Sequence, residues 1–162
     1  HKNGSADIEE IIGLSDEEEY SAQQAYADSK LANVLFALEL DRRLKEKNLS
    51  VESMACHPGF SATNLQNTVE NKDSFFRDLG MKIAKKILAQ SPEKGSLPMV
   101  YAGSSGNLSG GEYVGPGGLM NMRGLPEIQE PSEDARDEEL AERLWTVSED
   151  LTDTEFSVES QE

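Results

Sequence analysis

The chain has 162 residues, enough for one domain or part of one, and 36% of them are hydrophobic, which is adequate for a core. Acidic side chains outnumber basic ones by 31 to 15, and the net charge of −16 argues against nucleic-acid binding, because phosphate backbones are bound by clustered lysine and arginine. No apolar run approaches the roughly 18 residues that cross a bilayer, and no leader pattern is seen, so we expect a soluble protein.

Cysteine and histidine are scarce. The single cysteine, Cys56, excludes an internal disulfide framework and is typical of a reducing compartment, which predicts a cytoplasmic location. Cys56 lies in an apolar run, so we expect a buried, inert thiol and not a nucleophile. With His1 and His57 as the only histidines, no metal-ligand cluster is expected.

Residues 2–20 show no sustained period and are predicted to form a loop. Ser21 and Gln24 have the spacing of a capping box, which predicts that a helix begins near Ser21. Asn48 is a residue type that accepts the left-handed conformation and ends the helix. The apolar positions of this helix form a stripe that is wider than one contact surface needs, at Leu31, Val34, Leu35 and Leu38 with Ala32, Phe36 and Leu40 beside them.

A tyrosine and a lysine stand one helical turn apart near the start of this helix. Tyr26 and Lys30 are four residues apart, so both side chains project from the same face. A neighbouring positive charge favours the phenolate form of a tyrosine, which helps it to exchange protons with a carbonyl or alcohol oxygen. The spacing alone also occurs by chance, so its interpretation depends on the surrounding sequence.

Residues 50–57 read as a short strand covered on both sides, and Pro58 and Gly59 end it. Ligands of open parallel α/β sheets gather beyond the carboxyl ends of the strands, so the turn at residues 59–64 is a candidate cofactor site. The alternative is a plain turn that ends a strand.

Residues 73–90 have apolar side chains on one face and lysines on the other. We prefer a lid over a substrate pocket to a packing helix, and a packing helix to contact with a membrane. Ser91 and Pro92 then predict the start of a helix that continues to Gly103, with a distortion at Pro98.

Glycine dominates the next segment. Residues 112–114 are predicted to be a short strand at the sheet edge, and the glycines around them are not read as a phosphate loop, because no lysine or helix follows at the required spacing.

Residues 126–131 read as a linker-like bend. Ser132 or Asp134 is expected to cap a last helix that Trp145 anchors to the domain, and residues 150–162 look frayed. Residues 126–162 hold 14 acidic and 2 basic side chains, a net charge of −12.

Three segments together resemble one known family, namely residues 25–33 (AYADSKLAN), residues 56–59 (CHPG) with Thr63 beyond them, and residues 110–116 (GGEYVGP). They are similar to the short-chain dehydrogenase/reductases, and most to the retinol-dehydrogenase-like and protochlorophyllide-reductase-like branch. The resemblance covers nearly the whole chain but only about the second half of the family's domain. It implies an α/β fold, the C-terminal part of a Rossmann-type doubly wound parallel sheet with flanking helices. Residues 1–150 would form this partial domain, and residues 151–162 an acidic tail.

The resemblance also implies an activity and its residues. The family interconverts carbonyls and alcohols by hydride transfer with NADP or NAD, and the matching positions make Tyr26 the proton donor and Lys30 its partner and a ligand of the cofactor ribose. Pro58 and Gly59 would let the backbone approach the nicotinamide, and Thr63 would bind its carboxamide or a phosphate. The family's catalytic serine would fall before His1; Ser5 and Ser15 match it by residue type only.

Two kinds of function therefore remain open. One is an NAD(P)-dependent oxidoreductase acting on a small carbonyl or alcohol substrate, for which this chain alone is expected to be inactive because the family's cofactor-binding N-terminal half lies outside it. The alternative is a non-catalytic truncated fragment or an acidic interaction module. A homodimer through residues 26–44 is possible by resemblance, whereas membrane contact is not favoured and nucleic-acid binding is not expected.

Overall fold

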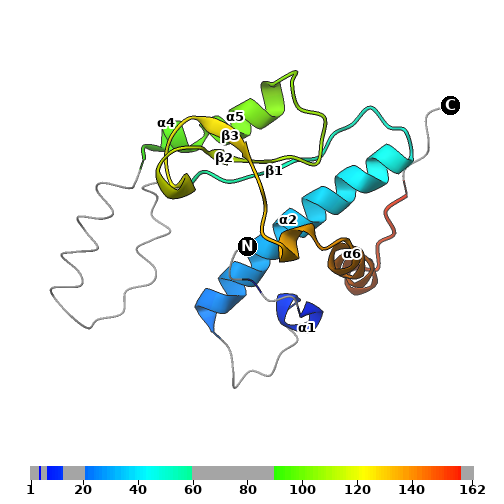
Figure 1. The fold of residues 1–162 in the computed structure, drawn as a ribbon. Helices are drawn as coiled ribbons and strands as arrows, with labels where there is room; N and C mark the ends of the chain where they lie inside the picture. The colour runs from blue at the N-terminus through cyan, green and yellow to red at the C-terminus, as the bar shows by residue number, and fades with distance from the viewer. Residues whose placement is uncertain (1–3, 5–6, 13–20, 60–89, 158–162) are drawn as a thin grey trace. The chain divides into compact units, whose positions relative to one another are not determined.

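The computed structural model describes residues 4, 7–12, 21–59 and 90–157 (Figure 1). Contacts between these residues divide the chain into two compact units. Unit 1 takes the described residues of His1–Ala55, Ser109–Tyr113 and Glu130–Glu162, and unit 2 takes those of Cys56–Leu108 and Val114–Gln129. Among the described residues, no helix combines the length and the apolar character that crossing a membrane requires.

Helix α2 (Ala22–Glu46) is the longest element of unit 1. The hydroxyl of Ser21 accepts a hydrogen bond from the backbone N–H of Gln24 at 3.4 Å, which confirms the predicted cap. The helix ends as predicted, because Asn48 takes the left-handed conformation with φ at 54°. Its apolar stripe is buried at Leu31, Val34, Leu35 and Leu44, while Ala32, Ala37 and Leu38 pack against the same core.

Helix α6 (Glu138–Thr152) packs against α2 and completes the core of unit 1 with Leu140, Ala141 and Leu144. The short helix α1 (Ile8–Ile11) adds the buried Ile8, although this segment was predicted to be a loop. The expectation of a loop was wrong because a helix of four residues is too short to show a period. Leu31, Val34 and Leu35 are thus buried within unit 1 and Ala32 and Leu38 are partly buried there, whereas Phe36 keeps 50% of its surface exposed.

The cap of α6 differs from the prediction. Asp137 accepts the hydrogen bond from the backbone N–H of Leu140 at 3.0 Å, whereas Asp134 begins the 3-10 turn η4 (Asp134–Arg136). The prediction of Ser132 or Asp134 was therefore wrong, because the turn delays the helix start. Trp145 is buried on α6 and stacks on Phe36 of α2, with ring centroids 5.2 Å apart, which confirms its role as an anchor.

Three strands form one sheet in the order β1, β2, β3, namely β1 (Ala55–Cys56), β2 (Tyr113–Pro116) and β3 (Pro126–Gln129). The N–H of Ala55 donates to the carbonyl of Glu112 at 3.0 Å, and that of His57 donates to the carbonyl of Val114 at 2.9 Å. Both partners advance by two residues in the same direction, so β1 and β2 are parallel.

This sheet corrects three expectations. The strand predicted over residues 50–57 is confined to Ala55 and Cys56. The strand predicted at the edge, β2, lies between the other two, because residues 126–129 form β3 and not a linker-like bend. A proline can begin a strand without loss of a ladder hydrogen bond, so Pro126 does not exclude one.

Cys56 is exposed, so the expectation of a buried thiol was wrong. In β1, Ala55 is buried and Cys56 is not, because successive strand residues point to opposite faces. Partial burial still raises the pKa of the Cys56 thiol, which leaves it protonated at neutral pH.

Unit 2 contains α4 (Pro92–Gly95) and α5 (Leu97–Ser104). The hydroxyl of Ser91 caps α4 by accepting from the N–H of Lys94 at 3.4 Å, as predicted. The predicted single helix is divided at Ser96, and Pro98 lies in the first turn of α5, where its missing N–H is not needed. Thr63, Ser5 and Ser15 lie outside the described residues, and so do residues 73–89 of the lid predicted over residues 73–90.

Candidate functional site

Tyr26 and Lys30 lie one turn apart in the first half of α2, as predicted. The Nζ atom of Lys30 is 5.3 Å from the centroid of the Tyr26 ring. Both side chains are exposed, and Tyr26 keeps 54% of its surface accessible. The pair can therefore contact a ligand from one side, with an ammonium close to a phenol.

Buried residues near Tyr26 and Lys30 determine which side of α2 faces solvent. Leu31 and Leu35 are fully buried, which turns the opposite side of α2 towards solvent. Asp28 is buried within the same turn, and Oδ1 of Asp28 accepts a hydrogen bond from Nε2 of Gln24 at 2.8 Å. The exposure of Tyr26 follows from the burial of its helix neighbours.

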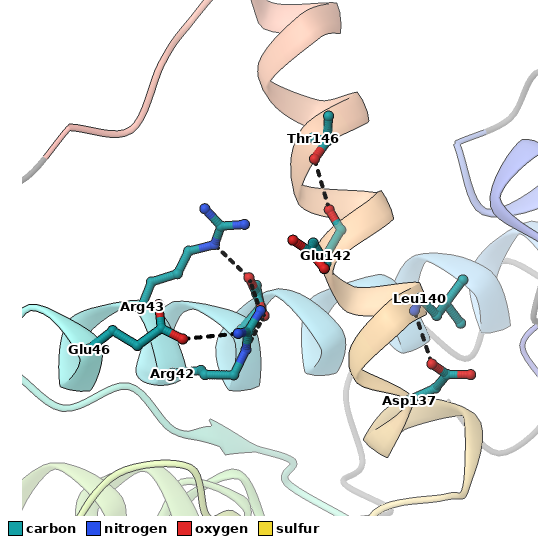
Figure 2. A network of polar contacts seen from close by, with 8 residues as sticks. Arg42, Arg43, Glu46, Asp137, Leu140, Glu142 and Thr146 are labelled. Atoms are coloured by element: carbon teal, nitrogen blue, oxygen red, sulfur yellow. Dashed lines mark hydrogen bonds and ion pairs between the residues drawn. The ribbon is translucent and has the colours of Figure 1, made fainter.

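The second half of α2 is held by buried carboxylates. Glu39 is 2% exposed and receives hydrogen bonds from Arg42 at 2.9 Å and from Arg43 at 2.5 Å. Hydrogen bonding to Glu39 raises the pKa of the Arg42 guanidinium. Figure 2 shows the further bond from Arg42 to Glu46, at 3.0 Å, and the capping contact of Asp137 with Leu140 at the start of α6.

A second buried carboxylate joins α2 to the loops that precede two strands. Oδ2 of Asp41 pairs with Nζ of Lys45 at 2.6 Å, and Oδ1 of Asp41 accepts from the N–H of Ser53 at 3.2 Å. Lys45 also donates to the carbonyl of Gly110 at 2.9 Å. These contacts fix α2 to the chain segments that enter β1 and β2, all within unit 1.

The Pro58–Gly59 turn lies in unit 2, directly after β1. Nδ1 of His57 accepts from the N–H of Gly59 at 3.2 Å, so this nitrogen carries no proton and Nε2 donates to Oε1 of Gln129, 3.0 Å away. Gln129 in turn donates to the carbonyl of Pro116 at 2.9 Å. Gly59 has φ at 66°, a conformation that favours glycine, and a Cβ there would collide with the carbonyl of Met122.

Gln90 also holds this turn. It is 5% exposed and donates from Nε2 to the carbonyl of Pro58 at 2.7 Å, while its Oε1 accepts from the N–H of Gly124 at 3.4 Å. The sequence gives no signal for Gln90 or Gln129 as positioning residues, because their partners are distant along the chain. Both became visible only in the folded structure.

A pocket of about 420 Å³ opens beside Gln90 in unit 2. Lys94 and Arg123 bring two positive charges to a lining that also contains Ser91, Leu97, Gly124 and Leu125. Such a lining suits an anionic group.

The glycines of the β2 region match the spacing G-x-x-x-G-x-G at Gly111, Gly115 and Gly117. In the structure, strand β2 lies inside this pattern and only the short 3-10 turn η3 (Leu119–Asn121) follows it. A phosphate loop follows a strand and opens a helix, so this match is not one. Gly115 instead packs against the ring of His57.

The predicted site residues thus fall into separate groups. Tyr26 and Lys30 lie together in unit 1, and Pro58 and Gly59 lie together in unit 2. Thr63 lies outside the described residues. Sequence reasoning found the Tyr26–Lys30 pair because both members lie within one helical turn.

Comparison with known proteins finds relatives that include several dehydrogenases. Mouse retinol dehydrogenase 13 is 33% identical over 150 residues, covering 91% of this chain and 41% of that protein. Mouse polyprenol dehydrogenase is 35% identical over 160 residues, covering 94% and 41%. The chloroplastic short-chain dehydrogenase TIC 32 B of Brassica napus is 30% identical over 148 residues, covering 87% and 40%. No family model matches the chain.

A solved structure agrees with these relatives. The crystal structure of an uncharacterized protein from Mycobacterium Paratuberculosis is 33% identical, with a TM-score of 0.68, and the match covers 96% of this chain and 47% of that one. The fold is therefore the α/β fold of the C-terminal part of a Rossmann-type domain. The chain corresponds to the C-terminal part of proteins of the short-chain dehydrogenase/reductase family. It spans about two fifths of the length of the curated relatives that it matches.

Proposed function

We propose that this chain carries the acid–base residues of an NAD(P)-dependent oxidoreductase that interconverts a carbonyl and an alcohol. The observation that supports the proposal most directly is the exposed pair on α2, with Lys30 Nζ 5.3 Å from the Tyr26 ring. The relatives, which include retinol dehydrogenases, support the same class of reaction. Because the chain spans only part of those relatives, the activity belongs to a protein that also supplies a cofactor-binding N-terminal part.

In this proposal Tyr26 transfers the proton. During reduction its hydroxyl donates a proton to the substrate oxygen, and during oxidation the phenolate takes that proton back. Lys30 places its ammonium beside the Tyr26 ring, and the ammonium hydrogens can bind the hydroxyls of a cofactor ribose. The nicotinamide cofactor, when bound, supplies or accepts the hydride.

The described residues fit such a cofactor at two places. Tyr26 and Lys30 offer a hydroxyl and an ammonium on one exposed helix face. The Pro58–Gly59 turn has a backbone fixed by His57 and Gln90, and it follows a strand of the parallel pair, where ligands of such sheets are bound. We propose that Pro58, Gly59 and Thr63 contact the nicotinamide side of NADP or NAD.

The proposal is testable in a chimera that joins the N-terminal part of mouse retinol dehydrogenase 13, which this chain does not cover, to residues 1–162. The measurement is the rate of nicotinamide-dependent oxidation of retinol. We expect Tyr26→Phe to lower this rate by about 100-fold or more, because it removes the transferable proton, and to leave cofactor affinity within about twofold. Lys30→Ala should lower the rate and weaken cofactor binding together.

The matched control is Tyr101→Phe, which removes the same hydroxyl from α5 in unit 2 and should leave the rate unchanged. A Tyr26→Phe chimera that keeps more than about a tenth of the rate would exclude proton transfer by Tyr26. A loss of rate in Tyr101→Phe equal to that in Tyr26→Phe would also contradict the proposal.

A further inference from the structure

An aromatic cluster lies on unit 1 outside the Tyr26–Lys30 site. Phe36 of α2 stacks on Trp145 of α6 with 5° between the ring planes, and Phe156 meets Trp145 edge-on, with centroids 5.2 Å apart in both pairs. Trp145 is 4% exposed, whereas Phe36 and Phe156 keep 50% and 39% of their surfaces exposed. The cluster therefore has a buried centre and two accessible rings.

These three rings line a pocket of about 400 Å³. The rest of its wall comes from the end of α6 and the segment after it, namely Ser148, Glu149, Thr152, Thr154, Glu155 and Ser157. All of these described lining residues belong to unit 1.

The segment after α6 is fixed by backbone contacts. Asp153 reverses the chain in a left-handed conformation, and the N–H of Thr154 donates to the carbonyl of Glu149 at 3.1 Å. The N–H of Phe156 then donates to Oε1 of Glu149 at 2.8 Å. This last bond lowers the pKa of Glu149, so the carboxylate is charged at neutral pH while it holds Phe156 against Trp145.

The cluster already accommodates one guanidinium. Arg43 lies with its guanidinium carbon 4.5 Å from the Trp145 ring centroid, and its charge is matched by Glu39 at 2.5 Å. Within the described part of the chain, Glu149 and Glu155 take part in no salt bridge. The pocket thus combines exposed aromatic rings with two carboxylates, and the charge of Arg43, which contributes to lowering the pKa of Glu149, shows that a guanidinium is favourable beside them.

Aromatic rings and carboxylates together attract organic cations. A guanidinium suits this lining better than an ammonium, because it is planar, weakly hydrated and able to stack on a ring while it binds a carboxylate. The surrounding residues 126–162 carry a net charge of −12, and this field favours a partner with several positive charges. We propose that the pocket formed by Phe36, Trp145 and Phe156 binds an arginine side chain in a basic segment of a partner protein.

The 162-residue chain can report this binding itself, because Trp145 is its single tryptophan. The probe is an acetylated tetrapeptide amide with one arginine, titrated against Trp145 emission at neutral pH and low salt. The matched probe replaces arginine by citrulline, which keeps the shape and removes the charge. We expect saturable binding of the arginine peptide that is about fivefold or more tighter than that of the citrulline peptide.

Variants locate the binding. Glu149→Gln and Phe156→Ala should each weaken the arginine peptide by about fivefold, while Asp150→Asn, which removes one exposed charge from α6 outside the pocket lining, should change binding by less than about twofold. Glu155→Gln provides a second pocket variant if Phe156→Ala alters the helical circular dichroism. The proposal would be overturned if the two peptides bound with equal affinity or if Asp150→Asn weakened binding as much as the pocket variants do. It would also be overturned if the arginine peptide showed no saturation up to about 10 mM.

Discussion

Gly115 illustrates how a single residue shapes unit 2. A Cβ at this position would collide with the ring of His57, and the side chain of Gln129 lies nearby. We expect Gly115→Ala to displace the His57 ring and to lower the free energy of unfolding by about 1–3 kcal/mol, as overpacked cores do. Urea denaturation of the 162-residue chain measures this change.

Gly103 is the matched control. It lies in α5, and a Cβ there would meet nothing within 4 Å. Gly103→Ala should leave stability unchanged or raise it by up to about 1 kcal/mol, because alanine favours the helix. Loss of stability in this control equal to that of Gly115→Ala would show that steric contact with His57 is not the cause.

At the scale of elements, α6 depends on a cap that the sequence pattern misplaced. Asp137→Ala should lower the free energy of unfolding by about 1 kcal/mol, because it removes the acceptor for the N–H of Leu140. Asp134→Ala, at one of the two cap positions that the sequence predicted, should cost less than about 0.5 kcal/mol. Thermal or urea unfolding compares the two variants, and a reversed order would contradict the assignment of Asp137 as the cap.

The segment after α6 should respond to pH. The hydrogen bond from Phe156 lowers the pKa of Glu149 in the folded chain, so the stabilisation from this bond is present above the unfolded pKa of Glu149 and is lost as pH falls through the folded value. Trp145 emission should therefore change below about pH 4.5 as Phe156 leaves the indole. Glu149→Gln should remove this step, and a step that persists in that variant would assign it to another carboxyl.

At the scale of the whole molecule, the large negative charge should make stability depend on salt. The net charge of −16 includes −12 on residues 126–162, and the structure places part of that charge on α6, which must dock on α2 through Leu140, Leu144 and Trp145. Salt shortens the Debye length from about 10 Å at 0.1 M to about 3 Å at 1 M, so repulsion within this surface should weaken. We therefore expect a higher thermal midpoint in 2 M KCl than in 0.1 M KCl.

A variant with Glu133→Gln, Glu142→Gln and Asp150→Asn tests whether charge repulsion causes the salt dependence. All three side chains are exposed, and the variant removes three negative charges. Its midpoint should rise less with salt than that of the unchanged chain. An unchanged midpoint in the original chain would show instead that the acidic residues are only solvated and do not repel one another measurably.

The sequence by itself determined the features that depend on neighbours within a few residues. Helix α2 begins at its Ser21 cap and ends before Asn48, Ser91 caps α4, and Tyr26 and Lys30 share a face, because capping and helical spacing are local. The three family segments also predicted the fold class, which the relatives and the solved structure confirm.

Only the tertiary structure decided the features whose partners are far apart in the chain. Strand β3 forms because it pairs with β2, which thereby becomes the central strand, and the Pro58–Gly59 turn is held by Gln90, which lies 32 residues beyond Pro58. The aromatic pocket likewise joins Phe36 of α2 to Trp145 and Phe156, more than a hundred residues later. Such contacts leave no periodic pattern, since strand pairing and side-chain packing are chosen by the whole fold.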